Sequence, residues 1–390
     1  MLEHDPLTFI GRTTFRRARR LFGIRLKDRR QHLYVIGQTG TGKSTLLEAL
    51  MRQDLVNGAG FALIDPHGDL AERVVSRCPP GRRSELTYWN VPDPSVTVTF
   101  NPLAASLPAT RILAASGALE VFKKLWLDSW GPRLEHLLRY ALLALVEIPG
   151  ATLADLLRLL EDDEFRRDAA QKVGNPQVRR FWLEDYPYYF PARRRAEALA
   201  PVQNKVGSFL AHPRLRQILC EGSESTDLRR LMDTGGVLVV NLSKGRLGED
   251  ATALFGALLV STLARLGLER ADQPEDARPD FAVYCDELQI FTTLSVANML
   301  AELRKYGVHL IVAHQYLAQL EPDVLHAILG NVGTLIAFRV GPSDVKVLAA
   351  MLDADLEPAD LMRLPNHHVY VRLMVDGMPR QAFSAEALRL

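Results

Sequence analysis

The sequence predicts an α/β fold with a mostly parallel sheet, and three observations lead to this class. Short apolar or β-branched runs recur along the chain, and several of them alternate with stretches of helical periodicity, as parallel strands joined by crossover helices do. The expected strands are 33–36, 61–64, 86–89, 237–241, 282–285, 308–313 and 335–338. One long central stretch is almost purely helical, and an Asp-Gly dipeptide separates two extended runs near the end.

The central helical stretch, residues 102–226, predicts an all-α domain inserted into the α/β core. Its apolar residues recur on one helical face, for example Leu134, Leu137, Leu138, Ala141, Leu142 and Leu145. The other expected segments are a basic N-terminal arm (1–30), the first part of the core (31–101) and the second part of the core (227–390).

A C-terminal β-hairpin is expected to close the second part of the core. Residues 368–374 and 379–383 flank Asp376 and Gly377. This dipeptide suits the positive φ angles of a tight hairpin turn, so the two runs should pair as antiparallel strands.

The composition excludes a disordered or fibrous protein. Hydrophobic residues make up 47% of the 390 residues and charged residues 24%, close to the averages of soluble globular proteins. The most apolar charge-free windows, 251–264 and 324–338, are shorter than the about 20 residues of a membrane span. The N-terminus also lacks the pattern of a signal peptide, so the expected location is cytoplasmic. The three cysteines are far apart, which indicates reduced thiols and no zinc site.

The net charge of +1 is unevenly distributed. Residues 12–30 hold nine Lys or Arg against one acid, Asp28, so this stretch carries +8 and the rest of the chain −7. A basic block on a mildly acidic body indicates an arm that faces a polyanion, either nucleic acid or anionic lipid headgroups. The alternative is a solvated surface helix.

A phosphate-binding loop is predicted at 37–44. The segment GQTGTGKS fits the pattern GxxxxGK[ST], follows an expected strand and opens a helix, which is the context that this motif requires. Its glycines let backbone N–H groups converge on phosphate oxygens beside a helix N-terminus. We expect Lys43 to reach the β- and γ-phosphates of ATP and Ser44 to coordinate Mg²⁺. The candidate nucleotide-binding residues are Gly37, Thr39, Gly40, Thr41, Gly42, Lys43, Ser44 and Thr45. The alternative is a plain glycine-rich turn.

Two acids supply the second half of such a site. The apolar run 281–285 ends in Asp286 and Glu287, which places both side chains at the carboxyl end of a strand, beside the phosphates. Asp286 is the candidate metal partner. Glu287 is the candidate general base that orients the attacking water.

Gln315 follows the expected strand 308–313 at the same edge of the sheet. Its amide is placed to hydrogen-bond both the γ-phosphate and the water, and so to couple the nucleotide state to movement of the segment that follows. The alternative is a polar residue that only caps the strand.

Two arginines complete the set of candidate catalytic residues. Arg304 precedes the strand 308–313, and at about 3.3 Å per residue the strand separates it from Gln315 by roughly 20 Å. We therefore expect Arg304 to serve a neighbouring subunit as an arginine finger, or else to form a surface salt bridge. Arg339 follows the run 335–338. If that strand is parallel, Arg339 lies at the nucleotide edge and acts in its own subunit or at a subunit junction.

An aromatic segment, YPYYFP at 186–191, precedes three arginines at 193–195. Aromatic rings beside arginines can stack single-stranded bases. The favoured alternative is a helix corner whose rings pack inward.

Longer motifs support a more specific interpretation. They are VIGQTGTGKSTL (35–46), ALIDPHGDL (62–70), TFNPL (99–103), LVVNLSKGRLG (238–248), VYCDELQIF (283–291), ELRKYGVHLIVAHQYLAQL (302–320) and GNVGTLIAFRVG (330–341). In this combination the chain resembles the FtsK/HerA superfamily of hexameric DNA-pumping ATPases, and within it the conjugative coupling proteins and type IV secretion-like ATPases. The resemblance covers nearly all of the chain from about Phe22.

The resemblance implies a RecA-like P-loop core with an all-α domain, assembled into a homo-hexameric ring around nucleic acid. ATP would lie between subunits, Arg304 would act in trans, and Asp65 would line the site. Coupling proteins usually carry N-terminal membrane helices, which this sequence does not show. A peripheral position at the inner face of the membrane would therefore need a membrane-bound channel partner or the basic arm.

The leading hypothesis is an ATP-hydrolysing ring-shaped motor that translocates single- or double-stranded DNA in conjugation-like transfer or DNA pumping. The first alternative is a type IV secretion or pilus-type ATPase that moves protein. The second alternative is a P-loop switch with little turnover. The pair Asp286 and Glu287, together with Gln315, argues against the switch, because a pure binding module does not need groups that polarise water.

Overall fold

The computed structural model describes residues 6–14, 19–105, 107–221, 225–352 and 356–389. The chain divides into two compact units. The sheet unit comprises Met1–Asn90, Leu228–Ser243 and Arg270–Leu390, and the helical unit comprises Val91–Asp227 and Lys244–Glu269. Each unit is described separately.

The sheet unit is built on an 11-stranded sheet with the order β2-β1-β13-β10-β9-β3-β8-β7-β4-β6-β5 among the described residues. The strands from β9 to β5 are mutually parallel, as the sequence predicts. Their bounds are β3 Leu33–Ile36, β4 Gly60–Asp65, β5 Leu86–Asn90, β6 Val237–Asn241, β7 Phe281–Cys285, β8 Val308–His314 and β9 Thr334–Ala337. The predicted α/β class is confirmed.

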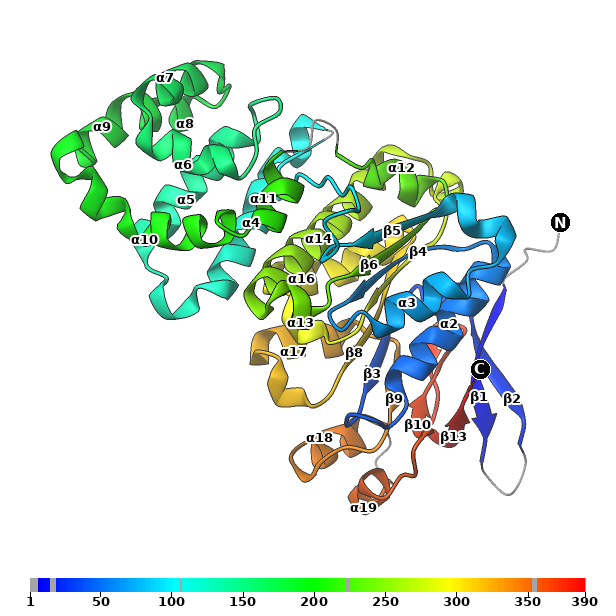
Figure 1. Ribbon diagram of the computed structural model, residues 1–390. Helices are drawn as coiled ribbons and strands as arrows, with labels where there is room; N and C mark the ends of the chain where they lie inside the picture. The colour runs from blue at the N-terminus through cyan, green and yellow to red at the C-terminus, as the bar shows by residue number, and fades with distance from the viewer. Residues whose placement is uncertain (1–5, 15–18, 106, 222–224, 353–355, 390) are drawn as a thin grey trace. The chain divides into compact units, whose positions relative to one another are not determined.

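Helices cover both faces of the parallel strands. Apolar residues of α2 (Lys43–Asn57) and α3 (Asp69–Ser76) form one buried cluster with alternate residues of the strands, such as Leu33 and Ile311. Figure 1 shows these two helices together over the sheet. Successive strand residues point to opposite faces, and Leu310 accordingly packs with α16 (Leu294–Leu303) and α17 (Pro322–Asn331). The other helices of this unit are α1 Leu26–Arg29, α12 Leu228–Asp233, α15 Leu288–Phe291, α18 Pro342–Leu352 and α19 Pro358–Met362.

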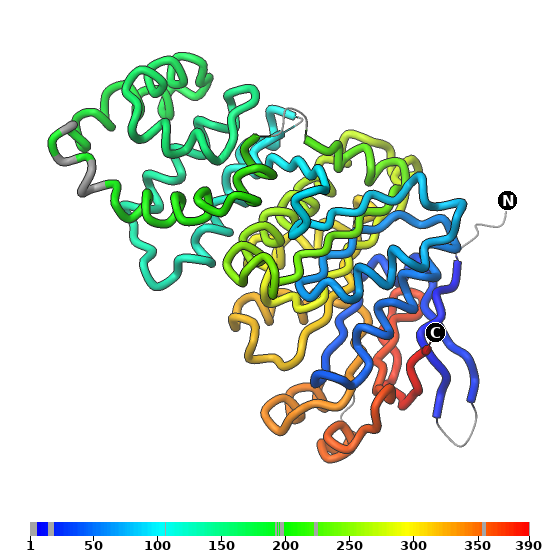
Figure 2. The backbone as a smooth tube through the Cα atoms, in the orientation of Figure 1, coloured from blue at the N-terminus to red at the C-terminus, as the bar shows by residue number. Residues whose placement is uncertain are grey.

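Four antiparallel strands extend the sheet beyond β9: β10 (His368–Arg372), β13 (Phe383–Ala387), β1 (Leu7–Thr13) and β2 (Leu21–Arg25). A small hairpin, β11 (Met374–Val375) and β12 (Met378–Pro379), turns at Asp376 and Gly377. Both turn residues have positive φ, 52° and 74°, so the predicted antiparallel hairpin is confirmed, although the strand that pairs with β10 is Phe383–Ala387 and not 379–383. Figure 2 traces the first strands of the chain beside its last one.

The N-terminal segment is part of the sheet, which corrects the expectation of a separate basic arm at 1–30. Ile10 and Ile24 are buried in the core of the sheet unit. The charge count of the segment hides these strands, because each strand holds a single arginine at or near its end, Arg12 in β1 and Arg25 in β2, and the other described basic residues lie outside the strands. Arg16 and Arg17 lie outside the described residues. Several basic side chains pair with acids of the same unit, including Lys27 with Asp376 at 2.7 Å.

Arg29 forms a buried bidentate ion pair that links three elements. Its guanidinium donates to both carboxylate oxygens of Asp54 on α2, each at 2.6 Å. It also donates to the hydroxyl of Tyr284 on β7, and that hydroxyl donates to Asp54 Oδ2 at 2.5 Å. The side chains of Arg29 and Asp54 are each 3% exposed. Because the Asp54 charge has no access to water, it depends on this arginine.

We expect Arg29→Ala to lower the free energy of unfolding by about 3–5 kcal/mol, because the substitution leaves a buried carboxylate without its partner. Urea unfolding followed by circular dichroism measures this change. The matched control is Arg30→Ala. Arg30 makes a similar bidentate pair with Asp280 but is 38% exposed, so its loss should cost only about 1 kcal/mol. Equal losses in the two variants would contradict the role of burial.

The helical unit contains α4 Arg111–Leu125, α5 Pro132–Leu145, α6 Ala154–Glu161, α7 Asp163–Lys172, α8 Pro176–Arg180, α9 Tyr186–Tyr189, α10 Ala192–Leu210, α11 Pro213–Cys220, α13 Lys244–Leu247 and α14 Glu249–Glu269. The six residues predicted to share one face of α5 are all buried. The expected boundaries of 102–226 leave out 244–269, which belongs to this unit. Residues 244–269 belong to the helical unit because α14 packs closely against α4. A Cβ at Gly117 of α4 would lie 2.4 Å from Ser261 Oγ of α14.

Helix α14 has an unusually apolar sequence. With its following turn, Glu249–Asp272, it is the one helix among the described residues that is long and apolar enough to cross a membrane. However, 89% of its most apolar window is buried inside the structure. Such burial is typical of the core helix of a folded unit.

The aromatic segment at 186–191 divides between the interior and the surface. Tyr186 stacks on Phe190 and is fully buried, with its hydroxyl donating to Leu160 O at 2.6 Å. Tyr188 and Tyr189 are 79% and 67% exposed. The expectation of inward packing therefore applies to the first and last rings only.

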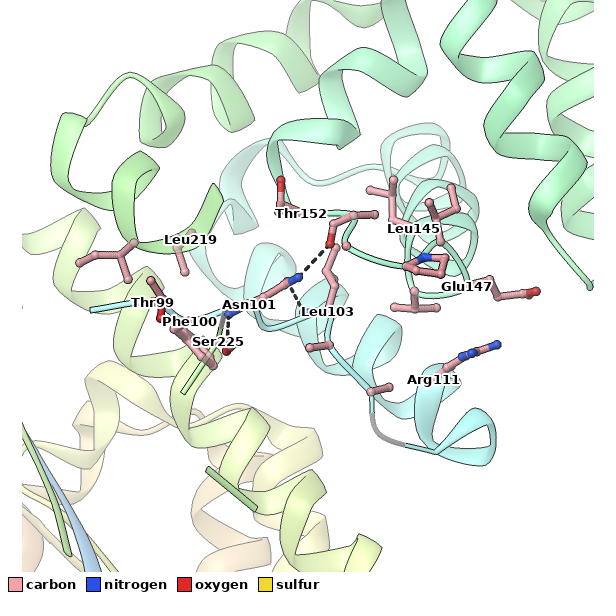
Figure 3. Close-up of a pocket in the computed structure, with 18 residues that line it drawn as sticks. Thr99, Phe100, Asn101, Leu103, Arg111, Leu145, Glu147, Thr152, Leu219 and Ser225 are labelled. Carbon is pink, nitrogen blue, oxygen red and sulfur yellow. Dashed lines mark hydrogen bonds between the residues drawn. The ribbon is translucent and has the colours of Figure 1, made fainter. Parts of the chain in front are cut away.

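A cavity of about 590 Å³ lies within the helical unit. Figure 3 shows that Asn101, from the TFNPL motif, lies in its wall. The Asn101 amide donates to Ala151 O at 2.9 Å and accepts from Leu103 N at 3.0 Å. The asparagine of this motif therefore ties the lining segments together.

Candidate nucleotide-binding site

The candidate site lies in the sheet unit, at the carboxyl ends of the parallel strands. Ile36 at the end of β3 is in register with His314 on β8 and with Ala337 on β9. The segments that follow these strands therefore emerge at one edge of the sheet, as the sequence predicts. This edge is where open parallel α/β sheets bind their ligands.

The loop between β3 and α2 has the backbone conformation that its glycines allow. Gly40 and Gly42 have φ angles of 76° and 120°, in the region that favours glycine. A Cβ at Gly42 would lie 2.6 Å from His367 Nδ1, and a Cβ at Gly37 would lie 2.5 Å from Phe338 Cβ. Thr39 and Gly40 are exposed at the tip of the loop. The loop can therefore bring its backbone close to a phosphate, beside the first turn of α2.

Lys43, the first residue of α2, holds its ammonium group inside this loop. Its Nζ donates to Gly37 O at 2.6 Å and to Gln38 O at 3.2 Å. Burial lowers the pKa of Lys43, while the nearby charges of Asp286 and Glu287 oppose this shift. Thr41 Oγ1 also donates to Gln38 O, at 2.7 Å. The ammonium group of Lys43 is thus held inside the loop, where the motif requires a positive charge to bind the phosphates.

Asp286 directly follows β7 and contacts the first turn of α2. Ser44 Oγ donates to Asp286 Oδ2 at 2.9 Å. The pKa of Asp286 is raised, mainly by burial and further by the charges of Asp65 and Glu287. A hydroxyl beside a carboxylate, in a surplus of negative charge, is a donor set that suits Mg²⁺. These residues therefore fit the metal that the sequence implies.

Glu287 is held by two amide side chains. Its backbone has φ 55°, a left-handed conformation that costs a non-glycine residue about 1–2 kcal/mol, and its side chain is buried. Gln315 Nε2 donates to Glu287 Oε1 at 2.8 Å, and Gln289 Nε2 donates to Glu287 Oε2 at 2.6 Å. The structure thus brings together Glu287 and Gln315, which are far apart in the sequence.

Two glutamines near the site were not predicted from the sequence. Gln289 holds Glu287, and Gln319 Oε1 accepts from the backbone N–H groups of Gln315 and Tyr316 at 2.9 and 3.1 Å. The only sequence signal was an amide side chain two positions after Glu287 and another four positions after Gln315. Such short spacings in loops do not predict which way a side chain points.

The two candidate arginines lie at opposite edges of the sheet. Arg339 follows β9 beside the phosphate-binding loop, where its guanidinium donates to Leu364 O and Asn366 Oδ1, each at 3.1 Å. Its carbonyl accepts from Gln38 N at 2.8 Å. Arg304 is exposed in the short turn before β8. It therefore lies at the amino end of that strand, whereas Gln315 follows the carboxyl end.

Asp65, at the end of β4, uses both carboxylate oxygens to fix the backbone. Oδ1 accepts from His67 N and Oδ2 from Ala71 N, each at 2.9 Å. The negative charge of Asp65 contributes to the raised pKa of Asp286. Its hydrogen bonds, however, fix the backbone of the DPHG segment and of the start of α3.

The fold and the site define a RecA-like P-loop nucleoside triphosphatase. Residues 9–113 match the family model described as the central domain of the helicase HerA. This match includes β1 and β2, which agrees with their place in the sheet. No curated protein sequence matches the chain.

Solved structures with the same fold cover most of the chain. The bacterial conjugative coupling protein TrwBdeltaN70 is 19% identical, with a TM-score of 0.66 over 93% of this chain and 86% of that one. VirB4 of Thermoanaerobacter pseudethanolicus is 16% identical, with a TM-score of 0.65 over 98% and 96%. A further TrwB structure contains ADP and Mg²⁺; it is 19% identical, with a TM-score of 0.64 over 93% and 86%. These likenesses show that the chain has the fold of these ATPases, and the match of residues 9–113 to the HerA model agrees with the predicted resemblance.

Proposed function

We propose that this protein is an ATP-hydrolysing, ring-forming motor that moves DNA, with the sheet unit as its ATPase. The observation that carries the proposal is the arrangement at one sheet edge of the phosphate-binding loop, the Ser44 and Asp286 pair, and the buried carboxylate of Glu287. A module that only binds nucleotide does not need Glu287 held in a strained backbone conformation between two amides.

The residues of the site have separate tasks in this proposal. The loop N–H groups and Lys43 bind the phosphates of ATP, and Ser44 with Asp286 holds Mg²⁺. When bound, Mg²⁺ would neutralise the negative charge that develops on the phosphates. Glu287 orients the attacking water and accepts its proton on a carboxylate oxygen. Gln315 is hydrogen-bonded to that carboxylate and senses whether the γ-phosphate is present. A change in this contact moves the segment that begins at Tyr316.

The two arginines are proposed to serve different subunits. Arg339 contacts residues around its own phosphate-binding loop, so it stabilises the site in cis. Arg304 is at the wrong edge for its own site, so it acts on a neighbour as the arginine finger. This arrangement requires a neighbouring subunit at each site, and we propose that a homo-hexameric ring supplies it.

We propose DNA as the cargo and conjugation-like transfer or DNA pumping as the process. The structural likeness to a conjugative coupling protein supports this proposal. The similar TM-score with VirB4 keeps a secretion ATPase that moves protein as the second candidate. For location we propose the cytoplasm, with recruitment to the inner face of the membrane by a channel partner.

The proposal predicts that DNA stimulates ATP turnover and that its affinity falls steeply with salt. Lys and Arg contacts to phosphates release condensed counterions, so the logarithm of affinity should fall with that of salt concentration by about 0.9 per phosphate contact on duplex DNA. ATP turnover is measured with duplex DNA, single-stranded DNA and no DNA, at several salt concentrations. The absence of stimulation by any DNA, with robust basal turnover, would favour the protein-moving candidate.

A further inference from the structure

We infer that Gln289 is a positioning residue for ATP hydrolysis, which fixes the carboxylate of Glu287 in the orientation that the attacking water needs. The inference rests on the proposed function, because it takes Glu287 as the base. It assigns a task to a residue for which neither the motif nor the resemblance provides one.

The geometry of the Glu287 carboxylate supports this role. Gln315 donates to one oxygen and Gln289 to the other, at 2.8 and 2.6 Å. A carboxylate that accepts at one oxygen can still turn about its terminal bond, whose torsional preference is broad. Donors at both oxygens fix its plane, and each oxygen keeps a further lone pair for the water.

The local backbone keeps Gln289 in place. Glu287 precedes the short helix α15, and Glu287 O accepts from Ile290 N at 3.0 Å. The left-handed conformation of Glu287 turns the chain so that the side chain two residues later reaches back to the carboxylate. The two donors come from separate elements, Gln289 from α15 and Gln315 from the segment after β8. Gln315 is the proposed sensor, so its contact with Glu287 changes with the state of the nucleotide. The contact that holds the Glu287 carboxylate throughout is therefore the one from Gln289.

The test uses Gln289→Met, which keeps the length of the side chain and removes its donor. We expect kcat for ATP to fall about 10- to 100-fold, because displacement of a catalytic group by about 1 Å can cost 10²-fold. The KM for ATP should change less than about twofold, since the proposal gives Gln289 no role in binding the phosphates. The matched control is Gln203→Met in the helical unit, which removes an amide donor to Glu161 at 2.7 Å and should leave kcat unchanged.

A second comparison separates positioning from support of the fold. In the Glu287→Gln background, Gln289→Met should cause no further loss of residual turnover, because a residue that acts through Glu287 has no effect without it. A further loss in that background, or a parallel loss of ATP affinity, would overturn the inference. If Gln289→Met does not fold, Gln289→Ala provides the same comparison with a smaller side chain.

Failure of the inference can be told apart from failure of the proposed function. If Glu287→Gln loses turnover while Gln289→Met retains the wild-type kcat, only the role of Gln289 is wrong. If Glu287→Gln itself turns over ATP normally, the base is elsewhere, and the proposed function fails with the inference.

Discussion

Glu287→Gln is expected to bind ATP with wild-type affinity and to turn it over about 10²- to 10⁴-fold more slowly, the range of a lost general base. Glutamine keeps the size of the side chain, but it cannot accept the proton of the attacking water. The substitution also places an amide where Gln315 and Gln289 both donate, so one of these two glutamines must turn its own amide over to accept, or lose its hydrogen bond. Calorimetry with ATP measures the binding, and single-turnover assays measure the chemical step.

The control for this prediction is Glu275→Gln, the same change at an exposed residue of the sheet unit, which should behave as wild type. A Glu287→Gln protein with ordinary turnover would assign the base to another residue. Loss of binding and turnover together would instead indicate that Glu287 supports the ground-state site.

Arg304→Ala is expected to bind ATP and form rings but to lose about 10³-fold in turnover, as arginine fingers do. Arg304 is exposed before β8, and Gln315 follows that strand. The seven residues of β8, at about 3.3 Å each, keep the guanidinium away from its own phosphates. Lys305→Ala changes the adjacent exposed cation, 57% exposed in its pair with Glu302, and should leave turnover nearly unchanged.

Mixing variants tests whether Arg304 acts in trans. A ring of Arg304→Ala and Glu287→Gln subunits contains junctions where an intact Glu287 faces an intact Arg304, so part of the activity should return. Arg339 lies beside its own loop, so Arg339→Ala mixed with Glu287→Gln should restore nothing. If the mixture with Arg304→Ala recovers no activity although the two proteins are shown to co-assemble, one of two conclusions follows. Either Arg304 does not act in trans, or the ring needs every site to be intact. Recovery with Arg339→Ala alone would give Arg339 the finger role.

The features that the sequence predicted are those set by local pattern. The seven parallel strands, the glycine conformations of the phosphate-binding loop and the turn at Asp376 each depend on a few adjacent residues. The edge assignments of Asp286, Gln315 and Arg304 were also predictable, because in a parallel sheet the residues before each strand lie at one edge and the residues after it lie at the other.

The features that were missed depend on contacts between distant segments. The strand β1 is stabilised by β13 and by Arg29, whose guanidinium donates to Thr8 Oγ1 at 3.2 Å. No periodicity within 1–30 reveals those partners. The close packing of α14 on α4 depends on Gly117 and Ser261, which are far apart in the chain. The orientation of Gln289 depends on the unusual φ angle of Glu287, which residue type alone does not predict.

The pairing of β1 with β13 determines the order in which the chain can fold during synthesis. Gly11 pairs with Ala387, so β1 leaves the ribosome long before its neighbour, and contacts of such sequence separation form slowly. Before β13 is synthesised, Gln53 of α2 can hold β1 in place. Its side-chain amide accepts from Phe9 N at 2.8 Å and donates to Phe9 O at 2.9 Å. A chain interrupted before Phe383 would expose unpaired edges on both β10 and β1, and such edges promote aggregation of nascent protein.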